Sequence, residues 1–302
     1  MNRIEEAMHA CRLCPRMCGA DRLHGKIGYC GEKAAIVAAR AALHRWEEPC
    51  ISGTGGSGTV FLSGCTLRCV FCQNREIAAG HSGREISLDR LAEIFLELQE
   101  KGAHNINLVT PTHYSVCLAE ALKKARANGL TIPVIYNTSG YERPEILREM
   151  EPYIDIYMPD FKYIDAETAA KYSHAADYFE VAKAALAEMV HQQSQPIWDE
   201  NGMLTKGVLV RHLVLPGHTG ESIRILQYLH EIYGESIILS IMNQYTPLEG
   251  VELPREISRK LTRGEYKRVV NAACRMGITQ AYIQEGETAK ESFIPPFSGE
   301  GL

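Results

Sequence analysis

The sequence predicts an α/β fold: a partial (β/α)6 barrel of TIM type with a cysteine-rich appendage in front of it. Short apolar stretches alternate with helical patterns from residue 58 onward, which indicates parallel strands joined by right-handed crossovers. The alternation alone also fits a doubly wound sheet. Polar residues follow each predicted strand, and three clustered cysteines follow the first, as expected when strand ends build one site. These two observations favour the barrel.

The six predicted strands are short, apolar and rich in β-branched residues, as strands buried on both faces should be. They comprise residues 59–63, 105–110, 133–137, 154–158, 207–215 and 237–242.

Helical patterns fill the gaps between the strands. Ser87 is placed to cap a helix that Gly102 ends. Its apolar residues fall on one face: Leu88, Leu91, Phe95 and Leu98. We expect further helices around 118–125, over 166–191 and over 221–233.

Composition bounds the function. The 302 residues are 45% hydrophobic, so the chain has enough apolar side chains for a large core. The net charge is −5, and the most basic stretch, 255–268, interleaves with Glu and apolar residues. We interpret it as a solvated helix face and expect no nucleic-acid partner. The N-terminus lacks a signal-peptide pattern and no apolar run is long enough for a membrane, so we expect a cytoplasmic protein.

Seven of the ten cysteines fall into two groups. In a reducing cytosol such groups indicate metal ligands or catalytic thiols rather than disulfides. Of the scattered ones, Cys117 and Cys274 are expected to be buried apolar side chains, and Cys50 has no assigned role.

Cys65, Cys69 and Cys72 form the more informative group. Three thiols at this spacing, in a loop after an apolar strand, suit an iron–sulfur cluster. Because a cubane has four irons, three ligands leave one iron open for a substrate or cofactor.

Cys11, Cys14, Cys18 and Cys30 form the other group. Four thiols beside glycines suit tetrahedral zinc or a closed iron–sulfur cluster, and the spacing does not decide between them. Reduced thiols without a metal are the alternative.

The other strand ends are also polar. They read Thr110-Pro111-Thr112-His113-Tyr114, Asn137-Thr138-Ser139-Gly140, Pro159-Asp160-Phe161-Lys162, Arg211-His212 with Pro216-Gly217, and Asn243-Gln244-Tyr245. Singly, Asn-Thr-Ser-Gly is a turn, and His113 and His212 are more often hydrogen-bonded structural histidines than ligands. Because these strand ends are expected to meet at one end of the barrel, they predict a binding site there.

At these residues the chain resembles the radical S-adenosylmethionine (SAM) superfamily, whose signature is the Cys65-x-x-x-Cys69-x-Phe71-Cys72 pattern. Within it, residues 58–245 resemble the activating enzymes of glycyl-radical proteins, such as pyruvate formate-lyase activating enzyme. The chain departs from that pattern where its second strand ends at Thr110, because Gly-Gly-Glu usually stands there and receives the amino group of SAM.

The resemblance implies roles for individual residues. Cys65, Cys69 and Cys72 would bind a [4Fe–4S] cluster whose open iron SAM chelates, and Phe71 would contact the adenine. Arg211 is the implied partner of the SAM carboxylate. Further residues are implied in SAM binding or a neighbouring cation site: Thr110, Asn137, Thr138, Met158, Asp160 and Lys162.

The leading hypothesis is therefore a radical SAM enzyme that takes electrons from a flavodoxin or ferredoxin. Its substrate is a glycyl-radical or other protein, or a small molecule. A non-catalytic iron–sulfur carrier or scaffold is the rival from another class. We expect a cysteine-rich appendage over 1–50, a radical SAM core over 51–250, and a C-terminal helix and tail over 251–302. The segment 291–297 would cover the barrel, touch a partner or simply pack on the surface.

Overall fold

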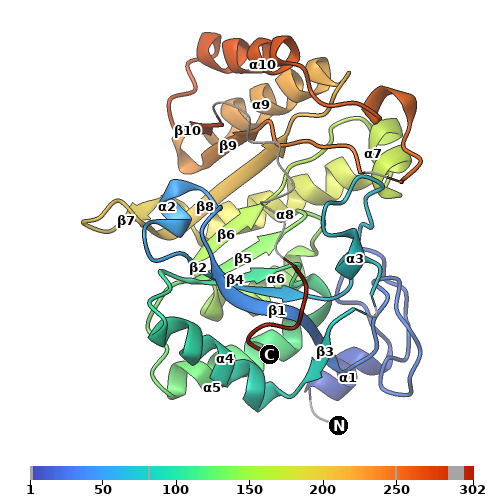
Figure 1. Ribbon diagram of the computed structural model, residues 1–302, viewed down its shortest axis with the longest axis vertical. Helices are drawn as coiled ribbons and strands as arrows, with labels where there is room; N and C mark the ends of the chain where they lie inside the picture. Colours follow the sequence, from blue (N-terminus) through green and yellow to red (C-terminus); the bar gives the residue numbers. More distant parts are fainter. Residues whose placement is uncertain (1–2, 81, 249, 285–295) are drawn as a thin grey trace.

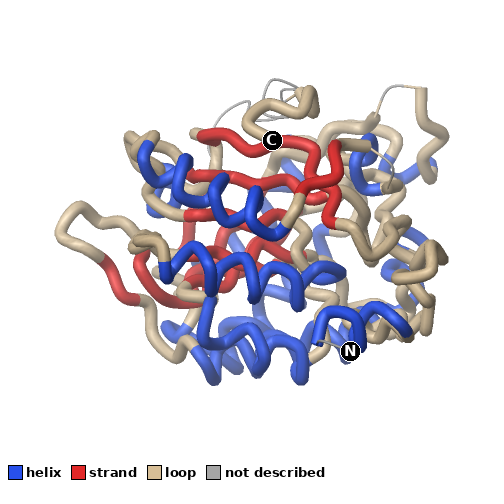
Figure 2. Tube along the Cα trace, turned by 90° about the horizontal axis from the view of Figure 1, so that it is seen from below, coloured by secondary structure: helices blue, strands red, loops and turns tan. Residues whose placement is uncertain are grey.

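In this computed structural model the chain folds around one mostly parallel sheet with helices along its outside (Figure 1). The structure describes residues 3–80, 82–248, 250–284 and 296–302. Seen from below, the helices lie against the strands (Figure 2). The expectation for 291–295 falls outside the described residues, while Phe297 packs its ring against Phe61 at a centroid distance of 5.4 Å.

All six predicted strands are present and run parallel, which confirms the fold class. They are β2 (Ser57–Leu62), β4 (Ile106–Val109), β5 (Val134–Thr138), β6 (Ile156–Pro159), β8 (Leu204–Leu213) and β9 (Ile238–Met242). A further parallel strand, β10 (Ala281–Ile283), extends the β9 edge. Sequence patterns missed it because three residues are too few to show a period.

The segment before the cysteine motif also joins the sheet. β1 (Ile36–His44) pairs antiparallel with β2 and with β3 (Arg84–Ile86), and β7 (Ile197–Trp198) pairs antiparallel with β8. The strand order is β10-β9-β8-β6-β5-β4-β2-β1-β3. The division at residue 50 stays a prediction, although residues 36–44 are continuous with the sheet.

The crossover helices begin and end largely where the sequence signals lie. They are α4 (Leu88–Glu100), α5 (Ser115–Ala127), α6 (Pro144–Met150), α7 (Ala166–Ser173), α8 (Tyr178–Gln192), α9 (Thr219–Tyr233) and α10 (Arg263–Arg275). Ser87 caps α4 by accepting from the Arg90 N–H at 3.1 Å, as predicted. Short helices are α1 (Arg3–His9), α2 (Pro49–Ser52), α3 (Arg75–Ala78) and the 3-10 turns η1 (Thr112–Tyr114), η2 (Glu151–Tyr153), η3 (Gly234–Ser236) and η4 (Arg255–Ile257).

The expected helix over 166–191 is wrong in one respect, because the structure divides it into α7 and α8. His174 takes a left-handed conformation, with φ of +53°, and closes α7. The apolar period continues across the break, which is why the pattern concealed it. The break matters for the site, since it lets Ser173 donate to the Cys69 sulfur at 2.9 Å.

The short helix α2 packs against the strands of the sheet. Cys50 and Ile51 pack into an apolar cluster with inward-facing strand residues: Ile135, Ile156, Met158, Leu204, Leu209 and Ile238. Cys117 is buried as expected, but Cys274 is exposed, which corrects that expectation. Cys274 lies near the end of α10, on a helix that buries only one face. Among the described residues, none of the helices has the length and apolarity needed to cross a bilayer.

Candidate active site

The three cysteines after β2 are half-buried in a loop that is held from several sides. The Leu67 N–H points at the Cys65 sulfur at 3.4 Å, and Ser173 donates to Cys69. Arg68 sits in the left-handed region, with φ of +56°, and so turns the chain between Cys65 and Cys69. The loop is therefore shaped to turn several sulfurs toward one side.

A cavity of 230 Å³ lies against this loop at the ends of the strands. Its lining includes Cys69, Phe71 and Cys72, together with charged and polar residues from four other strand ends: Asn137, Asp160, Lys162, Arg211 and Gln244. The convergence of polar strand ends predicted from the sequence is thus seen for these residues.

The thiols fit a metal cluster better than a set of free nucleophiles. Burial raises the pKa of Cys69, and burial together with the neighbouring thiols raises the pKa of Cys72 to about 12. Buried thiols are therefore neutral at pH 7 unless a cation displaces their protons, which is what iron does when thiolates ligate it. Three thiols beside a polar cavity are a suitable donor set for a cluster with one open iron.

Opposite charges form a network on the cavity wall. Asp160 accepts from Lys162 at 2.7 Å and from the Arg211 Nε at 3.0 Å. Arg211 also donates to Asn137 Oδ1 at 2.8 Å. Although burial opposes ionisation, the two cations hold the pKa of Asp160 below its usual range. Asp160 is thus a carboxylate whose charge is shared between Lys162 and Arg211.

Glu47 completes this network and was missed by the sequence analysis. Its carboxylate accepts from Asn107 at 3.1 Å and from Arg211 at 3.3 Å, and it lines the same cavity. Burial raises the pKa of Glu47. The residue belongs to the link between β1 and α2, where no motif marks it, so its position follows only from the packing of that link against the barrel.

Phe71 lies on the cavity wall between two other aromatic rings. Its ring makes edge contacts with Tyr172 and Tyr245, at centroid distances of 6.3 and 5.9 Å. The predicted adenine contact stays a prediction, because the ring serves both as a wall of the cavity and as an anchor for the cysteine loop.

Thr110 differs from the other predicted residues. It adopts φ of +60°, unusual for a β-branched residue, and donates its N–H to the Asn137 carbonyl at 2.9 Å. It lies outside the described cavity lining. Thr138 instead donates to Glu142, a buried carboxyl that also accepts from Thr112 at 2.5 Å. The roles proposed for Thr110 and for the cation site at Asn137, Thr138, Met158 and Asp160 therefore stay predictions.

The two strand-end histidines are structural, as interpreted from the sequence. His113 Nε2 lies 2.6 Å from the Ser63 carbonyl, and burial lowers its pKa to about 3. His212 is held between the Phe161 carbonyl and the Ser222 hydroxyl, at 2.7 and 2.9 Å.

The second cysteine group packs against the back of the first. Cys11, Cys14 and Cys30 are buried and Cys18 is exposed. The Cys30 carbonyl accepts from the Cys65 N–H at 3.1 Å, so one backbone hydrogen bond joins the two groups. Their predicted role as a second metal site stays a prediction.

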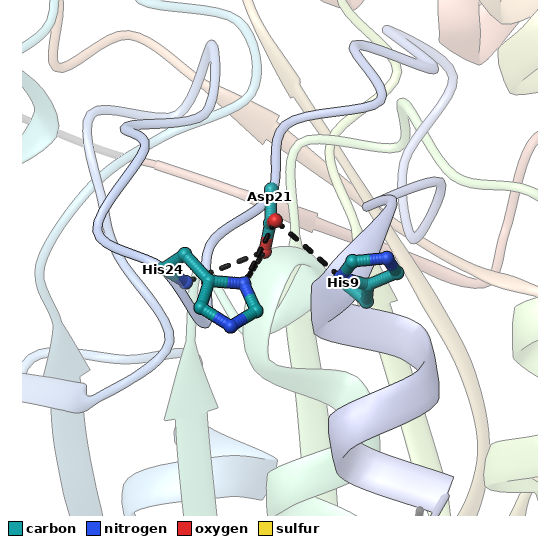
Figure 3. Close-up of side chains that lie close together, drawn as sticks. All are labelled: His9, Asp21 and His24. Carbon is teal, nitrogen blue, oxygen red and sulfur yellow. Dashed lines mark hydrogen bonds and ion pairs between the residues drawn. The ribbon is translucent and has the colours of Figure 1, made fainter.

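His9, Asp21 and His24 form a surface cluster that joins α1 to the loop after it (Figure 3). Asp21 is 2.8 Å from His24 Nδ1 and 3.4 Å from His9 Nδ1. Because both imidazoles are more than half exposed, a hydrogen-bonded link between α1 and the following loop accounts for it.

The radical SAM superfamily model matches residues 59–229, which is more than half of the chain. The chain is 25% identical to an uncharacterized protein of Methanocaldococcus jannaschii over 90% of this chain and 76% of that protein. It is 22% identical to the pyruvate formate-lyase-activating enzyme of Staphylococcus epidermidis over 55% of this chain and 65% of that enzyme.

Solved structures share the fold at low identity. Methylornithine synthase superposes with a TM-score of 0.51 and 15% identity, over 72% of this chain and 60% of that one. Streptococcus suis SuiB gives 0.50 and 13%, over 76% of this chain and 48% of that one. The chain thus spans only half to three fifths of these structures. Taken together with the cysteine loop and its cavity, the family match shows that the chain belongs to the radical SAM superfamily, whose members use a [4Fe–4S] cluster and SAM.

Proposed function

We propose that Cys65, Cys69 and Cys72 hold the [4Fe–4S] cluster, and that SAM binds in the adjoining cavity of this radical SAM enzyme. The observation that carries this proposal is the shared wall: two of the three thiols face the same cavity as Asp160, Lys162, Arg211 and Glu47. When bound, the cluster would supply one electron to cleave the SAM sulfonium, which would give methionine and a 5′-deoxyadenosyl radical able to abstract hydrogen.

The protein's own residues bind and orient the cofactor. SAM has a carboxylate, an ammonium and a sulfonium, so its site needs both signs of charge. Lys162 and Arg211 are cations suited to the carboxylate. Glu47 offers a carboxylate to the ammonium group, which supplies the charge that the strand end at Thr110 lacks. Phe71 is placed to stack on the adenine.

We propose a protein glycine as the hydrogen donor, with a reduced flavodoxin or ferredoxin as the electron source. Radical SAM chemistry requires a reductant. The support for a glycine is the similarity to the S. epidermidis activating enzyme, which is partial. A small-molecule substrate is the second candidate. An electron carrier is disfavoured, because such a cluster normally has a full ligand set instead of an open cavity beside it.

The test begins with 5′-deoxyadenosine release from SAM by anaerobically reconstituted protein and a strong reductant. Release that disappears in Cys69→Ala supports the radical SAM site. A fully loaded cluster that neither cleaves nor binds SAM would instead support the carrier.

The glycine assignment needs a separate measurement. Glycyl-radical proteins are added to the reaction and examined by electron paramagnetic resonance. A radical that couples to a glycine α-hydrogen supports the assignment, whereas cleavage without any such radical points to another substrate.

A further inference from the structure

The N-terminal quartet is defined as Cys11, Cys14, Cys18 and Cys30, and its Cys30 carbonyl accepts from the Cys65 N–H of the cysteine loop. Because Gly28 has no side chain, two sulfurs of the quartet can approach its backbone closely. A methyl group added at Gly28 would lie 3.3 Å from the Cys30 sulfur and 3.7 Å from the Cys18 sulfur. The exposed thiol of Cys18 and the buried thiol of Cys30 therefore both lie close to the backbone of Gly28.

A buried cation lies against this quartet. Arg22 is only 1% exposed, and its guanidinium lies 3.6 Å from the Cys11 sulfur. Its other hydrogen bonds in the described part of the chain go to main-chain carbonyls, those of Lys33 at 2.7 and 3.1 Å and of His113 at 2.6 Å. Carbonyl dipoles only partly compensate a buried charge, and neutral thiols do not. Metal-bound thiolates would place negative charge beside this cation, in addition to the buried Glu32, which acts on the same Cys30 thiol as Arg22 does.

The spacing of the thiols distinguishes an iron–sulfur cluster from a zinc ion. Tetrahedral zinc with Zn–S bonds of about 2.3 Å brings its sulfurs to within about 4 Å of one another. Among the described residues, the groups of three ligand atoms that all lie within 4.8 Å include His9, Asp21 and His24 but no three thiols of either cysteine group. The thiols of the quartet are thus spaced more widely than the ligands of one zinc ion, as are those of the Cys65–Cys72 trio, and this spacing favours a cluster.

We propose that the N-terminal quartet binds a second, fully ligated iron–sulfur cluster, and that buried Arg22 is its counter-cation. The class of ligand is a four-iron cluster, because four thiolates then leave each iron with a complete set. The proposal concerns a site separate from the SAM cavity, so it stands or falls independently of the proposed function.

Metal analysis gives the first test. It uses the full-length protein, reconstituted anaerobically, in a His24→Ala background, so that the surface cluster cannot take up zinc. We expect about eight irons per chain and no stoichiometric zinc, because two cubanes contain four irons each. Four irons with one zinc would overturn the proposal, and so would four irons with no second metal.

Cys18→Ser is the decisive variant, because Cys18 is exposed and its loss should leave the fold intact. Cys274→Ser is the matched control, since Cys274 is also exposed and lies far from both groups in sequence. We expect Cys18→Ser to lower iron content or to change one electron paramagnetic resonance signal of the reduced protein, while the control does neither. Unchanged iron and spectra in Cys18→Ser would overturn the assignment.

Adding SAM separates the two clusters. We expect SAM to perturb the signal that persists unchanged in Cys18→Ser, and to leave the quartet's signal as it is. If no signal responds to SAM while iron remains near eight, the proposed function fails and the second cluster stands.

Two substitutions of similar size test Arg22, one that removes its charge and one that keeps it. Removing a cation beside a cluster disfavours its more negative reduced form. We therefore expect Arg22→Met to lower the midpoint potential of the quartet's cluster, and Arg22→Lys to retain most of the wild-type value. Equal potentials in the two variants would remove the counter-cation role.

Discussion

The two cysteine groups of this protein touch through one backbone hydrogen bond, yet their surroundings differ. The Cys65–Cys72 trio borders a 230 Å³ cavity whose wall contains two cations and two carboxylates. The N-terminal quartet has three buried thiols and one exposed thiol, and the buried cation Arg22 lies against it. The group of three thiols thus borders room for a ligand, whereas the group of four has three of its thiols buried.

This difference fits the separate tasks that we propose for the two groups. A cluster that must bind an outside molecule needs an open iron and nearby charges that match the molecule. A fully ligated cluster needs only a compensated charge and a tight shell. Four predictions probe the contrast, in decreasing order of expected effect.

Cys69→Ala should abolish the open site. Without one of three ligands the trio should lose its cluster, and 5′-deoxyadenosine release should fall below detection. Iron content and product release by chromatography provide the measurement, with Cys274→Ser as control. Full turnover in Cys69→Ala would show that the trio is not the reactive centre.

Arg211→Ala should weaken both stability and SAM binding. It leaves Asp160 and Glu47 without their shared cation, which should lower the free energy of unfolding by about 3 kcal/mol. Combining it with Glu47→Gln should restore part of that loss. Denaturant unfolding and SAM titration measure the two effects. Wild-type affinity in Arg211→Ala would remove Arg211 from the SAM site.

Glu142 connects the two regions electrostatically. It accepts from Thr112 and Thr138 at the barrel's strand ends and helps to raise the pKa of Cys14 in the quartet. Burial raises the pKa of Glu142 from 4.5 to about 7. The folded state therefore holds a proton that the unfolded state releases, so its stabilising effect is complete below pH 4.5 and is lost as the pH rises through 7.

The corresponding loss of stability is about 3 kcal/mol, at 1.36 kcal/mol for each pKa unit. Glu142→Gln should flatten this dependence between pH 5 and pH 8. Unfolding free energies of both proteins across that range test it. Parallel pH curves would show that Glu142 does not carry the effect.

His24→Ala should have the smallest effect. The His24 side chain is largely exposed and water screens its pair with Asp21, so its loss should leave the free energy of unfolding nearly unchanged. Iron content should not change. A loss of iron in this variant would make the surface cluster part of the quartet's shell and would weaken the contrast between the two groups.

The sequence was a good guide where the signal is local. Six strands, the Ser87 cap and the cysteine loop all lie in runs of fewer than a dozen residues, and the structure has them in place. The sequence failed where the apolar period of one helix continues into the next, as across His174. It also failed where an element is too short to show a period, as in β10. The antiparallel strand β1 was not predicted, because its small residues gave no clear period.

The sequence by itself therefore determined the order of strands and helices and the place of the cysteine loop, because periodicity and cysteine spacing are properties of short segments. Only the tertiary structure decided which charges share the cavity and which cation lies against the quartet. Glu47 meets Arg211 across 164 positions, and Arg22 meets the His113 carbonyl across 91. Such contacts depend on how the segments before the barrel fold back onto it. No local pattern along the chain encodes which distant residues then meet.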